Sequence, residues 1–253
     1  MRTIRDTYLV FIYSLRTTGR NPVWVIIGIT QPIVWLLLFG PLLEGIAGSP
    51  GFPPGGALTV FTPGVLVLMA LFGTLFVGFG LIAEVRAGVI ERLSVTPVDR
   101  LALVLGRVLR DVVVLLAQSL VLLGVAWLMG MRASVPGVAV ALVLVALIGV
   151  TAASLSYALA LVLKDENSFA PTINFFTLPL LLLSGILLPL TLAPGWMQLV
   201  AAVNPFAYVV ESARDLFVGA AGGAPLARTF TVVSLCALLA LGWAARMFRR
   251  GVA

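Results

Sequence analysis

The sequence predicts an all-α integral membrane protein with six transmembrane helices. Three observations support this class: 61% of the 253 residues are hydrophobic and 10% are charged, six apolar stretches are long enough to span a bilayer, and basic residues fall mostly on one side of them. A soluble domain usually carries about 25% charged residues. A soluble fold is therefore excluded.

The six apolar stretches are each long enough to cross about 30 Å of hydrocarbon, which takes roughly 20 helical residues. They cover residues 22–43, 58–83, 108–129, 136–163, 169–191 and 229–247. None alternates apolar and polar residues as a strand does, and each is longer than a barrel strand, so helices are expected. The first stretch is also longer than the hydrophobic region of a cleavable signal peptide, so we expect it to stay in the membrane.

The basic residues indicate the orientation, because short cytoplasmic loops carry an excess of Lys and Arg. Three basic residues fall on one side, namely Arg132, Arg214 and Arg228, and 13 fall on the other: Arg2, Arg5, Arg16, Arg20, Arg86, Arg92, Arg100, Arg107, Arg110, Lys164, Arg246, Arg249 and Arg250. Both termini are therefore expected in the cytoplasm. The net charge of +6 is read as a topology signal, and no nucleic acid is expected as a partner.

The residues that are missing exclude several kinds of chemistry. The chain has no histidine and one cysteine, Cys236, so no Cys/His metal cluster is expected. Its one lysine, Lys164, follows Leu163, so a phosphate-binding G-x-x-x-x-G-K-[ST] loop cannot form. We therefore expect no catalytic residues, no metal and no cofactor bound by this chain, and any ATP-driven work would need the ATPase of a partner.

Residues 1–21 precede the spans and form the first unit, and residues 22–253 form the membrane domain. Five apolar residues in the first unit recur at helical spacing: Ile4, Tyr8, Phe11, Ile12 and Leu15. This pattern predicts an amphipathic helix along the cytoplasmic membrane surface. The alternative is a charged lead-in that only fixes the orientation.

Residues 84–107, between the second and third spans, are too polar for lipid. A short helix is expected through Glu91 and should stop before Pro97, because the residue before a proline is disfavoured in a helix. A new helix would begin there, with Thr96 as its N-cap and Pro97 at its first position. The alternative is an ordinary solvated loop.

Residues 194–219 lie before the last span, on the external side. They contain two short apolar-periodic pieces separated by Asn204 and Pro205, each too short to cross, so two short re-entrant or interfacial helices are expected. In the second piece, Glu211 and Arg214 are three residues apart and can pair. They would belong to an outer gate, or alternatively be interfacial charges that reach water.

Within the spans, a few residues could line an apolar cavity, although packing is the favoured role for each taken singly: Phe72, Phe76, Asn174, Phe175 and Phe176.

Two motifs together resemble ATP-binding-cassette (ABC) type-2 permeases, in particular the daunorubicin-resistance permease subunits. The first is the cytoplasmic pattern Glu84, Gly88, Glu91-Arg92-Leu93, Thr96-Pro97 and Gly106-Arg107; the second is the external pattern Pro194-Gly195-Trp196, Asn204-Pro205-Phe206-Ala207-Tyr208-Val209-Val210-Glu211, Arg214 and Gly219. Both stand where these permeases place them. Size, six spans, cytoplasmic termini and the N-terminal amphipathic helix agree, so the resemblance covers essentially the whole chain.

The resemblance implies an exporter with two permease subunits, identical or paralogous, and two separate ATPase subunits that bind ATP and Mg²⁺. The N-terminal helix would be the connecting helix, and a coupling helix around residues 88–95 would contact the ATPase through a set of residues in the cytoplasmic segment: Glu84, Arg86, Gly88, Glu91, Arg92, Leu93, Thr96 and Pro97. The second and fifth spans would line the path with the cavity residues. An external gate would include Asn204, Pro205, Tyr208, Glu211 and Arg214.

The function expected from this resemblance is export of a lipophilic drug, antibiotic or lipid-like compound across a bacterial plasma membrane. A polysaccharide or lipid-linked glycan exporter is the alternative within the superfamily. An ion-coupled carrier is less favoured, because it would need carboxylates near the bilayer centre. An intramembrane protease using Ser184 lacks a histidine base.

Overall fold

The computed structural model of the protein describes residues 2–20, 23–45, 55–89, 99–186, 190, 193–220 and 222–251. This part of the chain is helical and contains no strand. Its helices are α1 (Arg2–Arg20), α2 (Val23–Glu44), α3 (Ala57–Leu75), α4 (Gly78–Arg86), α6 (Arg100–Leu128), α7 (Val135–Leu163), α8 (Glu166–Leu182), α9 (Gly195–Ala201), α10 (Pro205–Phe217) and α11 (Ala224–Gly251).

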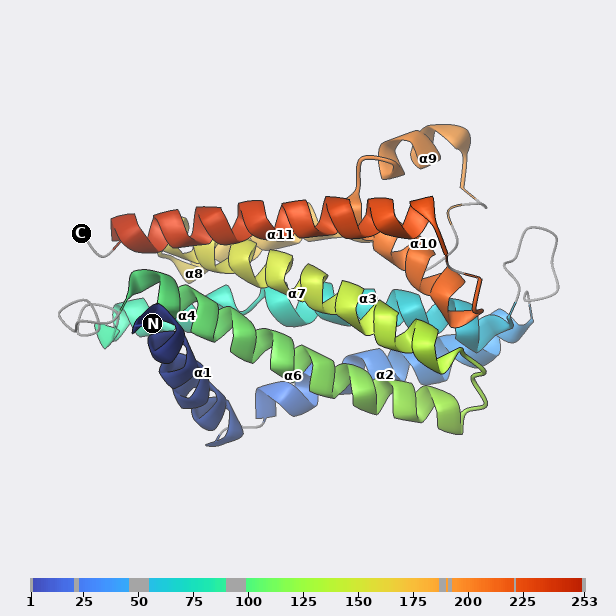
Figure 1. The fold of residues 1–253 in the computed structure, drawn as a ribbon, viewed down its shortest axis with the longest axis horizontal. Helices are drawn as coiled ribbons and strands as arrows, with labels where there is room; N and C mark the ends of the chain where they lie inside the picture. The colour runs from blue at the N-terminus through green and yellow to red at the C-terminus, as the bar shows by residue number, and fades with distance from the viewer. Residues whose placement is uncertain are drawn as a thin grey trace.

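The long helices lie side by side along the longest axis of the molecule (Figure 1). Helix α7 is central, since it contacts α3, α4, α6, α8, α10 and α11. Helix α3 is also an interior element, because every residue from Ala57 to Leu71 is buried. The two termini lie at the same end of the bundle, together with α4, and α9 and α10 lie at the opposite end (Figure 1).

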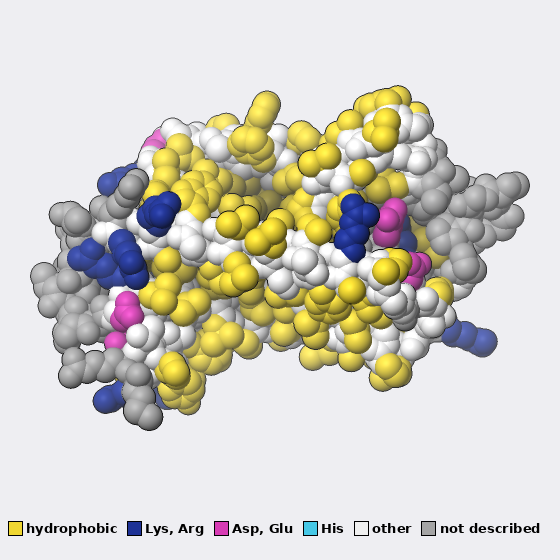
Figure 2. All heavy atoms as spheres, turned by 45° about the horizontal axis from the view of Figure 1, so that its top comes forward, with side chains coloured by type: hydrophobic (Ala, Val, Ile, Leu, Met, Phe, Trp, Pro, Cys, Tyr) yellow, Lys and Arg dark blue, Asp and Glu magenta, His cyan; other side chains and the backbone are white. Residues whose placement is uncertain are grey.

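Five segments of the described chain are long and apolar enough to cross a membrane: α2 from Val25, α3 with α4, α6, α7, and α11 as far as Arg249. The face of the molecule in Figure 2 is consistent with this, because charged side chains gather toward its two ends and apolar side chains cover the middle. These segments correspond to five of the six predicted spans, and the all-α prediction is confirmed for the described residues.

The predicted fifth span, 169–191, differs from the structure. Helix α8 starts earlier, at Glu166, where the side chain of Asp165 accepts from Ser168 N and caps the helix. It ends at Leu182, and Gly185 then adopts a φ of 69°, a left-handed conformation that glycine accepts without strain. Its 17 residues extend about 25 Å. A continuous helix over 169–191 was therefore the wrong prediction.

The predicted second span is interrupted. Helix α3 ends at Leu75 and α4 begins at Gly78, and between them Phe79 N and Gly80 N bond to carbonyls three residues back, at Phe76 and Val77. Such tight turns inside a helix often mark a hinge.

Helix α1 confirms the predicted N-terminal helix and packs on the first turns of α6. Gly106 of α6 allows this approach, because a Cβ there would lie 2.7 Å from Cβ of Val10 and 2.9 Å from the carbonyl oxygen of Thr7. The hydroxyl of Thr18 in α1 accepts a hydrogen bond from Nη1 of Arg110 at 2.9 Å. Contacts at both ends of α1 therefore hold it against α6, with Ile4 and Tyr8 on its exposed side.

Replacing Gly106 with leucine should separate α1 from α6, because overpacking of this kind costs roughly 1–3 kcal/mol. We expect limited trypsin digestion of the purified protein to cleave at Arg5 and Arg16 several-fold faster. Gly124→Leu in the same helix is the matched control, since no atom lies within 4 Å of the Cβ position there. Equal cleavage of both variants would contradict the packing of α1 on α6.

Candidate functional site

The residues predicted to couple the chain to an ATPase divide into two groups. Glu84 and Arg86 lie in the last turn of α4, and Gly88 follows it. The other five predicted coupling residues lie outside the described residues: Glu91, Arg92, Leu93, Thr96 and Pro97. The structure shows how the two ends of the segment that carries them, residues 90–98, are attached to the bundle.

The end at α4 is held by three ion pairs. Glu84 pairs with Arg107 of α6 at 2.6 Å, and Arg86 pairs with Asp165 at 2.9 Å and with Glu166 of α8 at 3.6 Å. Gly88 adopts a φ of 67° and its N–H donates to the carbonyl of Val85, which closes the helix. This left-handed turn is a position where glycine is strongly favoured.

The other end is held by Asp99 and Arg100. Asp99 caps α6 by accepting from Leu101 N at 3.0 Å, and it accepts a second hydrogen bond from Oγ1 of Thr3 at 2.8 Å. These hydrogen bonds, that from Thr3 first, lower the pKa of the Asp99 carboxyl. Arg100 donates to the carbonyl of Arg249 in α11 at 2.9 Å. The predicted helix start at Thr96 and Pro97 is corrected, because α6 begins at Arg100 and Asp99 is its cap.

A buried polar cluster in α6 was missed by the sequence analysis, which began the third span at residue 108. The hydroxyl of Tyr157 in α7 donates to Asp111 and accepts from Nη2 of Arg110, and Asp111 also lies 2.9 Å from Nε of Arg110. One turn earlier, the guanidinium of Arg107 lies 5.7 Å from the ring centre of Phe248 in α11. Arg107, Arg110 and Asp111 have the spacing of one helix with the apolar residues that follow them. This pattern was the signal in the sequence that could have extended the third helix toward its N-terminus.

The five residues proposed to line a path form two separate groups. Phe72 and Phe76 stack at 6.2 Å, and the row continues through Phe79 to Phe169 of α8. The other three lie on the exposed side of α8, namely Asn174, Phe175 and Phe176, with exposed fractions of 72% and 58% for the two rings. Phe175 and Phe176 contact each other at 5.3 Å, and no ring contact joins them to Phe72 or Phe76 in the described part of the chain.

Helices α9 and α10 confirm the prediction of two short helices before the last span, and three predicted gate residues set their geometry. Asn204 caps α10 by accepting from Phe206 N at 3.0 Å, and its Nδ2 donates to the carbonyl of Leu180 at the end of α8. Pro205 occupies the first turn of α10. The hydroxyl of Tyr208 donates to the carbonyl of Ala202, and Arg228 of α11 lies over the Tyr208 ring at 4.9 Å.

Arg214 is not placed as the sequence suggested. It is buried, with 8% of its surface exposed, and it donates to backbone carbonyls at Val60 of α3 (2.9 Å) and Gly185 (2.7 Å). The carbonyl of Gly185 lies beyond the end of α8 and so lacks a partner in that helix. The predicted Glu211–Arg214 ion pair is absent between these two described residues, and Glu211 is exposed. Arg214 therefore joins α10, α3 and the turn after α8.

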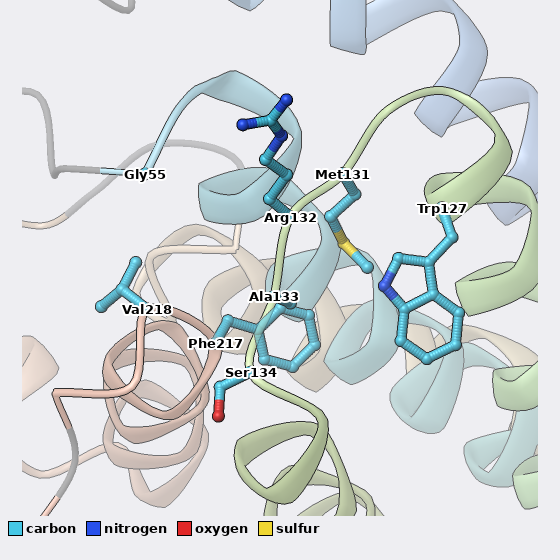
Figure 3. Close-up of a pocket in the computed structure, with 8 residues that line it drawn as sticks. All are labelled: Gly55, Trp127, Met131, Arg132, Ala133, Ser134, Phe217 and Val218. Atoms are coloured by element: carbon cyan, nitrogen blue, oxygen red, sulfur yellow. The ribbon is translucent and has the colours of Figure 1, made fainter.

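Two hollows lie at the same end of the bundle as α10. The larger, about 660 Å³, lies between the α6–α7 connection and the end of α10, and its walls are Gly55, Trp127, Met131, Arg132, Ala133, Ser134, Phe217 and Val218 (Figure 3). The α6–α7 connection is fixed there, because Ser134 N donates to the carbonyl of Phe217 at 2.9 Å. A smaller hollow of about 390 Å³ lies between α10 and α11, and the residues that line it include Tyr208, Glu211 and Asp215. None of the proposed path residues lines either one.

Comparison with known proteins gives a consistent assignment. Residues 5–218 match the model of the ABC-2 type transporter family. The chain is 30% identical over 206 residues to the daunorubicin resistance ABC transporter permease protein DrrB1 of Streptomyces coeruleorubidus, covering 79% of this chain and 71% of that protein. It is 30% identical over 204 residues to the putative transport permease ycf38 of Cyanophora paradoxa, covering 78% and 69%. It is 27% identical over 259 residues to the probable doxorubicin resistance permease DrrC of Mycobacterium tuberculosis (strain H37Rv), covering 95% and 88%.

The buried Arg214 gives a testable consequence for stability. Arg214→Gln should lower the free energy of unfolding by roughly 1–3 kcal/mol, because buried carbonyls lose their donors. Arg214→Lys should cost less, since it keeps the charge and one donor direction. Thermal unfolding midpoints in detergent measure both effects, and Arg132→Gln, which changes an exposed arginine, is the control. Unchanged midpoints in both Arg214 variants would contradict a stabilising role for the hydrogen bonds from Arg214 to Val60 and Gly185.

Proposed function

The chain belongs to the ABC-2 type transporter family, and from that premise we propose that it exports a lipophilic drug, antibiotic or lipid-like compound. As an ABC-2 membrane permease it has no ATPase site of its own, and permeases of this family pair with ATPase subunits. The observation that carries the substrate proposal is the similarity of about 30% to a daunorubicin resistance permease, supported by 27% identity to a probable doxorubicin resistance permease over 95% of this chain.

We propose a topology of six crossings in a bacterial plasma membrane, with both termini in the cytoplasm. The chain is a multi-pass integral membrane protein. The orientation is supported by the 13 basic residues on the side of the termini and by the position of both termini at one end of the bundle. The sixth crossing would be α8 with the residues that follow it, since about 25 Å is only slightly short of the hydrocarbon thickness.

We further propose that the functional unit holds two permease subunits and two ATPase subunits, with ATP and Mg²⁺ bound by the ATPases. The second permease is supported by polar residues at span depth on the outside of the bundle, since Gln31 of α2 and Asn174 of α8 are both exposed. A polar amide that faces hydrocarbon without a partner is costly. A second permease, identical or paralogous, would cover these faces together with Phe175 and Phe176.

The proposed mechanism is a population shift driven by the partner. Binding of ATP would bring the ATPase subunits together and move the coupling segment as a rigid body, which biases the bundle between inward-open and outward-open states. The contacts at both ends of this segment support the idea, because an ion pair of Arg86 and hydrogen bonds of Asp99 and Arg100 attach it to the start of α8, to α1 and to α11. The chain itself performs no bond chemistry in this scheme.

The substrate proposal is tested in proteoliposomes that contain the chain with its ATPase subunit. We expect ATP-dependent transport of doxorubicin into inside-out vesicles, unaffected by a protonophore. Transport that the protonophore abolishes while ATP remains present would favour an ion-coupled carrier. ATP hydrolysis stimulated by a lipid-linked glycan and not by doxorubicin would favour the glycan exporter.

The coupling proposal predicts that the double variant Glu91→Ala/Arg92→Ala transports doxorubicin several-fold more slowly, while the ATPase of the complex retains its basal activity. The reason is that the ATPase subunits would still hydrolyse ATP but would no longer contact the coupling segment. Arg132→Ala, which removes a basic residue at the other end of the molecule, should leave both activities unchanged. Normal transport with normal substrate-stimulated hydrolysis in the double variant would refute these two residues as coupling contacts.

A further inference from the structure

The joint between α3 and α4 is completed by a side chain from another helix. Ser156 of α7 is fully buried, and its hydroxyl donates to the carbonyl of Leu75 at 2.6 Å and accepts from the N–H of Gly78 at 2.9 Å. Both backbone groups lie at the interruption, since Leu75 ends α3 and Gly78 begins α4. The hydroxyl therefore satisfies the backbone without making it a continuous helix, and α4 can change direction there at low cost.

The first turn of α4 is attached to α8 by close packing. A Cβ on Gly78 would lie 2.5 Å from Cζ of Phe169, so this glycine permits the contact. Phe79 meets the same ring edge to face, with the ring centres 5.0 Å apart and Phe169 fully buried. The first contact between α4 and α8 is thus apolar and lies beside the joint.

The last turn of α4 is attached to the start of α8 by charge. Arg86 pairs with Asp165, the N-cap of α8, and with Glu166 in its first turn, at 2.9 and 3.6 Å. Acidic groups at a helix N-terminus also interact favourably with the helix dipole. Because α4 and the start of α8 contact each other at both ends of the nine-residue α4, they are expected to move together.

A third contact holds α4 against α6. Glu84 pairs with Arg107 at 2.6 Å, and the Arg107 side chain is only 8% exposed. Nη1 of this guanidinium is buried without a hydrogen-bond partner. The pair is therefore incompletely satisfied, and it is the contact that a movement of α4 away from α6 would break.

We propose that α4 and the first turn of α8 form a lever hinged at Leu75–Gly78, with Arg86, Asp165 and Ser156 as positioning residues. The lever carries movement of the segment after Gly88 into α8, the helix that bears Asn174, Phe175 and Phe176. This inference rests on the proposed function, because it needs an ATPase to move that segment. It adds a direct connection between the coupling segment and one specific helix.

The test follows α8 directly, without relying on a particular substrate. In the complex with its ATPase, Phe175→Cys in a Cys236→Ser background provides one thiol in this chain, on the side of α8 that would face the second permease, and a maleimide reports its accessibility. We expect ATP to change the labelling rate several-fold. Arg86→Ala and Asp165→Asn should each remove most of that change, and the complex with Asp165→Asn should keep its basal ATP hydrolysis. Asparagine still caps a helix, so Asp165→Asn removes the charge and keeps the start of α8.

A double variant of Arg86 and Asp165, together with a control variant, tests whether this ion pair transmits the movement. If Arg86 and Asp165 act as one pair, the double variant should lose no more of the response than either single variant. Arg246→Ala removes an exposed arginine of α11 and should respond as the parent does. A full response in the double variant would overturn the lever and leave the proposed function standing. Absence of any ATP response or hydrolysis in the parent complex would overturn the proposed function and the lever with it.

Discussion

The structure depends on one constraint, that backbone polar groups inside a bundle surrounded by hydrocarbon must find partners within the protein. Each place where a helix is interrupted shows how this is met. Ser156 serves the joint between α3 and α4, while Arg214 and Asn204 serve the end of α8 through the carbonyls of Gly185 and Leu180. These side chains allow irregular backbone at positions where the bundle would otherwise need an unbroken helix.

The apolar stretches were predictable because a membrane span requires length and hydropathy, which are local properties of the sequence. The short helices α9 and α10 were predictable for a similar reason, since Asn204 and Pro205 are a local start signal. The interruption at Phe76 and Val77 was not, because no proline marks it and its partner, Ser156, lies 78 residues from Gly78. The end of α8 at Leu182 likewise lies within an apolar run.

The charged residues show the limit of local reasoning more clearly. Arg107, Arg110 and Asp111 look like loop residues when hydropathy is the guide, yet they lie inside α6 because Glu84, Tyr157 and Phe248 from three other helices surround them. Glu211 and Arg214 have the spacing of a helical pair, whose benefit in water is small. Arg214 lies on the buried side of α10 and is instead satisfied by carbonyls of two other segments.

The two ends of the bundle differ in the free energy that is needed to separate their helices from one another. At the end that carries the termini, Arg86 and Asp165 are each more than a third exposed, and an exposed pair of this kind contributes about 0–1 kcal/mol, because water replaces the lost partner. At the other end, moving Arg214 away would leave a buried cation and two buried carbonyls unsatisfied, at roughly 1–3 kcal/mol for each group. This exposed pair can therefore be broken with little loss, whereas the packing of Phe79 on the fully buried Phe169 keeps α4 attached to α8. Opening the opposite end requires either a larger input of free energy or water that enters to solvate Arg214.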